Sequence, residues 1–238
     1  MIEINGLTKC YKNRIAVNEL SLKIDDGEIF GLLGLNGAGK TTTIKMLSGV
    51  AEPTKGSATV YGHALSDVEG LKSVIGISPQ ESAVSPVLNV KENLVFVATL
   101  YGFDNKDAKT RAENLMRKFD LIDRAKDKAK SLSGGLCRRL SIAMALISEP
   151  KVLFLDEPTL GLDILSRREL WSIIKSLKKE MTVVLTTHYL EETEALCDKI
   201  AIMRDGKLVA VGTSDELIKL SGKENFEEAF IKLSGESA

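Results

Sequence analysis

The stretch Gly34-Leu35-Asn36-Gly37-Ala38-Gly39-Lys40-Thr41 decides the fold of this chain. It fits the pattern G-x-x-x-x-G-K-[ST], with a strand-like run at residues 29–33 before it and a helical pattern at residues 41–47 after it. Glycines let backbone N–H groups converge on phosphates, and a helix N-terminus adds its dipole. We therefore expect Lys40 to reach the β- and γ-phosphates of a nucleotide and Thr41 to bind Mg²⁺. The alternative, a chance glycine-rich turn, is disfavoured by the complete pattern and both flanking elements.

A second motif, Val152-Leu153-Phe154-Leu155-Asp156-Glu157, complements the first. An apolar strand would deliver two carboxylates to its carboxyl end, where ligands bind in open α/β sheets. We expect Asp156 to hold Mg²⁺, directly or through water, and Glu157 to polarise an attacking water as a general base. Paired acids at a strand end are commonly a solvated turn, but the phosphate-binding pattern favours the functional interpretation.

A third motif, Leu132-Ser133-Gly134-Gly135, precedes a helix expected over residues 138–147. Ser-Gly-Gly at the start of a helix is a further anion-binding pattern. The same residues also suit a helix N-cap followed by loop glycines. Taken alone, the motif favours the N-cap.

Composition excludes several classes of protein. The 238 residues are 44% apolar and 27% charged, which is ordinary for a globular protein and argues against disorder. Thirty-two basic and 33 acidic residues give a net charge of −1, without the basic excess of a general nucleic-acid binder. The longest stretches without a charged residue have eleven residues, against about 20 for a membrane span. Three scattered cysteines and no secretory signal predict a reduced, cytoplasmic, soluble protein.

The order of the elements predicts an α/β fold. Strands are expected at residues 152–155 and 182–186, and helices at 166–179 and 191–197. Strands alternating with helices indicate a mainly parallel sheet, here interrupted by a helical insertion over residues 85–149 that includes a helix at 106–119. Alternating apolar positions around a turn at 12–14 indicate N-terminal strands. Residues 221–238 are expected to form a polar linker and one short amphipathic helix.

Together these motifs resemble the ATP-binding subunit of an ABC transporter over nearly the whole chain. Gln80 matches the Q-loop glutamine, Ser133-Gly134-Gly135 the signature motif, and Gly161-Leu162-Asp163 the D-loop. Tyr11 matches the aromatic residue that stacks on adenine, and His188 matches the switch histidine. The resemblance implies a P-loop NTPase core with a mainly parallel sheet, an N-terminal antiparallel β portion and an inserted helical subdomain.

The resemblance also implies roles for individual residues. Structural alternatives remain at four positions: an edge-strand aromatic for Tyr11, a loop amide for Gln80, a helix cap for Asp163 and a local hydrogen bond for His188. Catalysis is expected of Glu157 and His188, with ATP and Mg²⁺ as cofactors. Mg²⁺ binding is expected of Thr41, Gln80 and Asp156, and nucleotide binding of Tyr11, Val17, Gly34, Asn36, Gly37, Ala38, Gly39, Lys40, Thr41, Thr42, Gln80, Ser133, Gly134, Gly135 and Asp163.

The resemblance further implies an ABC ATP-binding domain over residues 1–220. Its catalytic core would comprise residues 1–84 and 150–220, its helical subdomain about 85–149, and a C-terminal tail helix would follow in 221–238. ATP would close a head-to-tail homodimer or heterodimer, held between the P-loop of one subunit and the signature motif of the other. Residues 81–90 and the helical insertion would dock on a membrane-spanning permease subunit at the cytoplasmic face of the cell membrane. No nucleic-acid partner is implied.

One departure from the family pattern bears on activity. Leu136 stands where a glutamine usually follows Leu-Ser-Gly-Gly, but Glu157 and His188 are retained, so an active ATPase is expected. The segment 186–192 resembles the drug, antibiotic and sodium export branch, which favours export over import. Two alternatives stay open: a non-transport ABC ATPase, disfavoured by the neutral charge and single P-loop, and a non-hydrolysing regulatory partner of a heterodimeric transporter, weakly favoured by Leu136.

Overall fold

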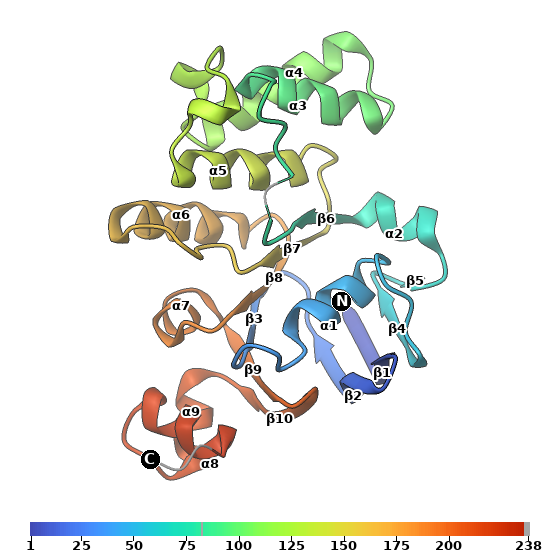
Figure 1. Cartoon of the computed structure of the whole chain (residues 1–238), viewed down its shortest axis with the longest axis vertical. Coiled ribbons are helices and arrows are strands. Elements are labelled where there is room, and N and C mark those ends of the chain that lie inside the picture. The colour runs from blue at the N-terminus through green and yellow to red at the C-terminus, as the bar shows by residue number, and fades with distance from the viewer. Residues whose placement is uncertain (82, 236–238) are drawn as a thin grey trace.

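A computed structural model of the chain describes residues 1–81 and 83–235, and it contains two sheets (Figure 1). The first sheet is antiparallel and has the strand order β2-β1-β4-β5. Its β1–β2 hairpin turns at Lys12 and Asn13, which confirms the N-terminal antiparallel portion. The strands are β1 (Ile2–Tyr11), β2 (Arg14–Ile24), β4 (Lys55–Val60) and β5 (His63–Ala64).

The second sheet has the order β10-β9-β3-β8-β7-β6 and is parallel except for the pairing of β10 with β9. The expected mainly parallel sheet is thus confirmed. In its register, Leu33 of β3 pairs with Thr187 of β8, and Asp156 of β7 pairs with Thr186. The carboxyl ends of three neighbouring strands therefore lie together. The strands are β3 (Ile29–Leu33), β6 (Ile75–Ser78), β7 (Val152–Asp156), β8 (Thr182–Thr187), β9 (Lys199–Arg204) and β10 (Lys207–Gly212).

The helices surround this sheet, with α3 and α4 at one end of the molecule and α8 and α9 at the other (Figure 1). No helix in residues 1–81 and 83–235 is long and apolar enough to cross a membrane. Short 3₁₀ turns lie at Ile122–Arg124 and Ala129–Ser131. The helices are α1 (Lys40–Leu47), α2 (Val68–Val74), α3 (Val90–Leu100), α4 (Asn105–Lys118), α5 (Gly134–Ala145), α6 (Ile164–Leu177), α7 (Leu190–Leu196), α8 (Ser214–Ser221) and α9 (Phe226–Ser234).

The C-terminal region has the expected linker and short helix, preceded by a helix that was not expected. The expected short helix is present as α9, but α8 precedes it, and its N-terminus has a capping box in which Thr213 and Glu216 bond each other's backbone N–H groups. Phe226 and Phe230 of α9 pack with Leu33 and Ile202 against the sheet. Residues 236–238 of the expected tail lie outside the described residues.

Strand β7 separates two hydrophobic clusters, which is why its sequence is an unbroken apolar run. Phe154 packs on the side of β1, β2 and α1, whereas Leu153 and Leu155 pack on the side of α3, α4, α5 and α6. Side chains on both faces of β7 are fully buried. A parallel strand covered on both faces favours continuous apolar residues over alternation. The buried strand ends at Asp156, so the carboxylates begin where the apolar run stops.

Glu192 is a fully buried carboxylate that joins α7 to α6 and to the turn after β7. Its Oε1 accepts hydrogen bonds from Thr159 Oγ1 at 2.9 Å and from Trp171 Nε1 at 3.1 Å. Burial raises the pKa of Glu192, although hydrogen bonds from Thr187, Thr159 and Trp171 oppose this effect. The protonated form of a buried acid is easier to accommodate than its charged form.

Glu192→Gln tests the cost of that buried charge. The pKa of Glu192 is raised in the folded protein, so its contribution to the free energy of unfolding falls as the pH rises through the folded-state pKa. Glutamine keeps an acceptor for Thr159 and Trp171 without titrating. We expect the free energy of unfolding of the variant to increase relative to the native chain as the pH rises above 4.5, the ordinary pKa of a glutamate. Urea denaturation at several pH values measures the difference, and a constant difference would contradict the assignment.

Candidate active site

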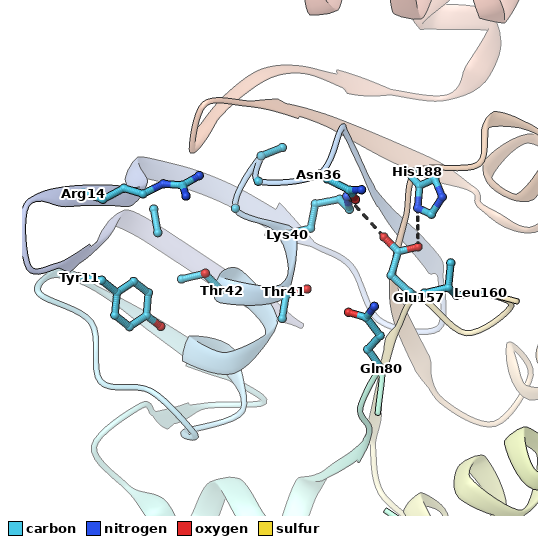
Figure 2. A pocket seen from close by; sticks show the side chains of 14 residues that line it. Tyr11, Arg14, Asn36, Lys40, Thr41, Thr42, Gln80, Glu157, Leu160 and His188 are labelled. Carbon is cyan, nitrogen blue, oxygen red and sulfur yellow. Dashed lines mark hydrogen bonds and ion pairs between the residues drawn. The ribbon is translucent and has the colours of Figure 1, made fainter. Parts of the chain in front are cut away.

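A cavity of about 600 Å³ opens beside the carboxyl ends of β3 and β7 (Figure 2). Its volume lies within the range of about 300–1,000 Å³ that is usual for small-molecule sites. Tyr11 and Arg14, from the β1–β2 hairpin, lie at one end of the lining, while Glu157 and His188 lie at the other. The lining residues are Tyr11, Arg14, Ala16, Asn36, Gly37, Ala38, Gly39, Lys40, Thr41, Thr42, Gln80, Glu157, Leu160 and His188.

The loop between β3 and α1 requires glycine at two positions. Gly37 has a φ of 86° and Gly39 a φ of 101°, both in a region that side chains rarely adopt. A Cβ on Gly39 would also lie 2.5 Å from the carbonyl oxygen of Ala16. The loop therefore packs closely on β2 and opens α1 at its N-terminal end, where backbone N–H groups favour an anion.

Lys40, the first residue of α1, folds back over this loop. Its Nζ donates hydrogen bonds to the carbonyl oxygens of Gly34 at 2.6 Å and Leu35 at 3.2 Å. The same Nζ lies 3.5 Å from Glu157 Oε1, and the side chain is only 6% exposed. The ammonium is thus held at the cavity by backbone carbonyls and one carboxylate.

Asp156 and Glu157 leave the end of β7 in different directions. Asp156 Oδ1 accepts hydrogen bonds from Thr41 Oγ1 at 2.9 Å and from Thr186 Oγ1 at 2.5 Å, which ties β7 to α1 and β8. Glu157 has a φ of 48°, and its N–H donates to Thr186 Oγ1 at 3.0 Å. Left-handed backbone at a residue other than glycine is strained and recurs at functional sites.

The Glu157 carboxylate lies between two potential cations, as the dashed lines in Figure 2 show. Its Oε2 is 2.9 Å from His188 Nδ1, and its Oε1 faces Lys40. Glu157 is 7% exposed, so Lys40 and His188 replace most of the water that would otherwise contact its carboxylate. A carboxylate at a cavity wall can accept a proton from a water molecule, and an imidazole in contact with that carboxylate can orient the water.

The structure brings most of the expected residues to one place. Gly34 does not line the cavity, but its carbonyl oxygen accepts a hydrogen bond from Lys40 Nζ. Asp156 does not line the cavity either, and it accepts a hydrogen bond from the lining residue Thr41. Val17 does not line the cavity, because its side chain is fully buried in the core beneath the loop. The expected residues that line the cavity are Tyr11, Asn36, Gly37, Ala38, Gly39, Lys40, Thr41, Thr42, Gln80, Glu157 and His188.

Ser133, Gly134, Gly135 and Asp163 form a second cluster, which is separate from the cavity. Ser133 caps α5 by accepting from the N–H of Leu136 at 3.3 Å. Asp163 caps α6, and hydrogen bonds from the backbone and side chain of Ser166 lower its pKa. A Cβ on Gly135 would lie 2.9 Å from Ser166 Oγ, so the two helix starts are adjacent. None of these four residues lines the cavity.

Arg14, Ala16 and Leu160 also line the cavity and were not predicted from the sequence. Arg14 Nη2 would lie 3.1 Å from a Cβ on Gly37, which places the guanidinium over the phosphate loop. Its closeness to Tyr11 in the hairpin was the available signal. Leu160 follows Glu157 in the same turn, and no sequence pattern singled it out.

Comparisons with known proteins agree with this geometry. The linearmycin resistance ATP-binding protein of Bacillus subtilis is 42% identical over 224 residues, or 93% of this chain and 72% of the relative. The doxorubicin resistance ATP-binding protein of Mycobacterium tuberculosis is 40% identical over 225 residues, or 93% and 68%. A solved dimeric ATP-binding cassette, in a post-hydrolysis state bound to ADP and Pi, has a TM-score of 0.81 at 25% identity and covers 90% of this chain and 98% of its own.

A family model described as ABC transporter matches residues 17–160. That range includes the phosphate loop, Gln80, the Ser133 motif and the Asp156–Glu157 pair. The fold, the cavity and the comparisons thus agree, and the chain belongs to the ABC transporter family as one of its ATPases.

Proposed function

We propose that this chain is the ATP-hydrolysing subunit of a membrane exporter for drug-like or antibiotic-like compounds. One observation carries the hydrolysis: Lys40, Glu157 and His188 are in contact at a cavity opened by the phosphate loop. The proposed direction of transport and the proposed class of cargo rest on relatives whose names state resistance to linearmycin and doxorubicin. The cargo itself would be bound by a membrane subunit.

Each lining residue has a distinct role in this proposal. Tyr11 would stack on adenine, and Lys40 would exchange its carbonyl partners for the β- and γ-phosphates. Asn36, Thr42 and the glycines would surround the phosphates. Glu157 would accept a proton from the attacking water, and His188, bonded to Glu157, would orient it towards the γ-phosphate.

The oxygen atoms beside the phosphate loop fit a magnesium ion. Thr41 Oγ1 and Asp156 Oδ1 are 2.9 Å apart, and Gln80 lines the cavity with its amide. Hydroxyl, carboxylate and amide oxygens are ligands that Mg²⁺ accepts. Thr41, Asp156 and Gln80 would hold the ion, which supplies charge neutralisation for the phosphates when bound.

The second cluster, formed by Ser133, Gly134, Gly135 and Asp163, supports a head-to-tail pair of subunits. Ser133, Gly134 and Asp163 are exposed and outside their own cavity, so a nucleotide that contacts them would be bound by another subunit. Ile164 and Leu165 beside them are 69% and 74% exposed, which suits a surface that a partner covers. The solved ATP-binding cassette with ADP and Pi is a dimer, which supports pairing.

The membrane partner is proposed to dock in a second groove of about 400 Å³. Val50, Val68 and Tyr101 at its mouth are 66%, 45% and 47% exposed, although they are apolar or aromatic. The groove lies between α1, α2, β6 and α3, where the proposed catalytic core (1–84 and 150–220) meets the helical subdomain (about 85–149). An amphipathic helix from the permease subunit fits this chemistry and would hold the chain at the cytoplasmic face of the membrane.

Lys40→Ala should weaken ATP binding by about tenfold to a hundredfold, because hydrogen bonds from a charged donor are lost. Lys45→Ala, an exposed lysine of the same helix, is the matched control and should bind ATP normally. Isothermal titration calorimetry with ATP measures both affinities. Equal affinities in the two variants would refute the assignment of the phosphate loop.

Glu157→Gln should separate binding from hydrolysis. The amide keeps the shape of the side chain but cannot take a proton, so hydrolysis should fall by about 10²- to 10⁴-fold while ATP still binds. The variant should then accumulate an ATP-dependent dimer in light scattering. Adding Ser133→Arg should block that dimer, since a bulky side chain would meet the facing nucleotide. A Glu157→Gln chain that stays monomeric at saturating ATP would contradict the pairing.

Val50→Asp tests the docking groove. A charge at this apolar mouth should abolish co-purification with the transporter's permease subunit after co-expression. Leu220→Asp on α8, also at a position 66% exposed, is the matched control. Both variants should keep ATP hydrolysis in solution. Loss of the permease subunit from both, or from neither, would exclude this groove as the docking site.

A further inference from the structure

Arg138, in the second turn of α5, is a buried arginine that the hydrolysis scheme does not use. It is 9% exposed, and its guanidinium donates three hydrogen bonds to backbone carbonyl oxygens. Nε bonds Pro158 O at 3.0 Å, Nη1 bonds Pro79 O at 2.5 Å and Nη2 bonds Asp156 O at 2.7 Å. One side chain therefore connects α5 to two loops that are distant in sequence.

The three carbonyls border the reactive groups. Pro79 directly precedes Gln80, whose side chain lines the cavity. Asp156 and Pro158 stand on either side of Glu157, the residue with a φ of 48°. Because its two neighbours are bonded to one rigid guanidinium, the peptide units around Glu157 have little freedom to relax.

The chemistry of these contacts requires arginine. A guanidinium is planar and presents donors in several fixed directions, so it can span carbonyls on separate segments. An ammonium is a compact charge on a flexible stem and cannot span the same three positions. Burial lowers the pKa of Arg138, while the Asp156 carboxylate opposes this effect, and an arginine side chain stays charged in either case.

We propose that Arg138 is a positioning residue for hydrolysis, which fixes Glu157 and Gln80 relative to each other through the carbonyls of Asp156, Pro158 and Pro79. Arg138 itself touches no part of the nucleotide cavity. Its effect falls on the hydrolytic step and leaves ATP binding by the phosphate loop unchanged. This inference rests on the proposed role of Glu157 as the general base.

The neighbouring Arg139 provides a matched control. It is 8% exposed on the same helix, but it bonds the carboxylates of Asp120, at 3.5 Å, and Glu169, away from the cavity. Arg138→Lys and Arg139→Lys thus make the same chemical change in two buried arginines, of which only one contacts the Glu157 turn.

The experiment measures ATP-binding stoichiometry and affinity without Mg²⁺, so that the proposed metal ligand Gln80 does not affect binding, and then, with Mg²⁺ added, the single-turnover hydrolysis rate per bound ATP. Arg138→Lys should keep stoichiometry and affinity but hydrolyse about 10- to 100-fold more slowly, the loss that a displaced reacting group causes. Arg139→Lys should hydrolyse at the native rate. A structural role alone would instead lower the binding stoichiometry of Arg138→Lys with a native rate per bound site.

A native rate per bound ATP in Arg138→Lys would overturn the inference, as would equal slowing in Arg139→Lys. Failure of the proposed function looks different, because Glu157→Gln would then hydrolyse ATP as fast as the native chain. Thermal unfolding of each variant without nucleotide sets an assay temperature at which all of them are folded.

Discussion

The buried contact between Lys40 and Glu157 is the constraint around which the site is built. Both side chains are less than 8% exposed, and a buried charge without partners costs several kcal/mol. Lys40 satisfies its ammonium with two carbonyls of the phosphate loop and with Glu157, and Glu157 is shared with His188. These contacts require the ends of β3, β7 and β8 to be neighbours, which the order β3-β8-β7 provides. A phosphate entering the loop would offer Lys40 a stronger acceptor and so change the partners of Glu157.

The turn that carries Glu157 is held from two sides. Arg138 binds the carbonyls of Asp156 and Pro158, and Thr159 donates to the buried Glu192 carboxylate. A glutamate keeps a left-handed backbone conformation only where several surrounding contacts hold it in place. Here the surroundings are two buried ionisable side chains, Arg138 from α5 and Glu192 from α7. The position of the Glu157 carboxylate therefore depends on α5 and α7, which do not themselves line the cavity.

The central strands and the cavity could be predicted from sequence because the signals are local. β3, β7 and β8 are apolar runs next to recognisable motifs, and their parallel pairing follows from the alternation of strands and helices. β6 was missed, since Ile75-Gly76-Ile77-Ser78 is short and contains a glycine. That glycine is needed because a Cβ there would collide with the carbonyl of Ala145 in α5, a contact visible only in three dimensions.

The directions of side chains and the contacts between distant segments were harder to predict from the sequence. Val17 was expected at the nucleotide, but neighbouring residues of a strand face opposite sides, so Ala16 lines the cavity and Val17 enters the core. The start of α5 was expected at 138, whereas the helix begins at Gly134 with Ser133 as its cap. Arg138 carried no sequence signal, because its three partners are backbone carbonyls from two other segments.

The separation of the two glycine-containing motifs within one chain is the feature with the widest consequence for the proposed pairing. The phosphate loop faces its own cavity, while Ser133 and Gly134 lie at the surface beside Asp163. A rigid sheet and α5 fix this separation within one chain, so the two motifs meet one nucleotide only if two chains contribute. In the proposed pair, each Ser133 loop begins the helix whose Arg138 holds the Glu157 turn of its own subunit. A nucleotide bound by one chain would thus contact the helix that positions the general base of the other.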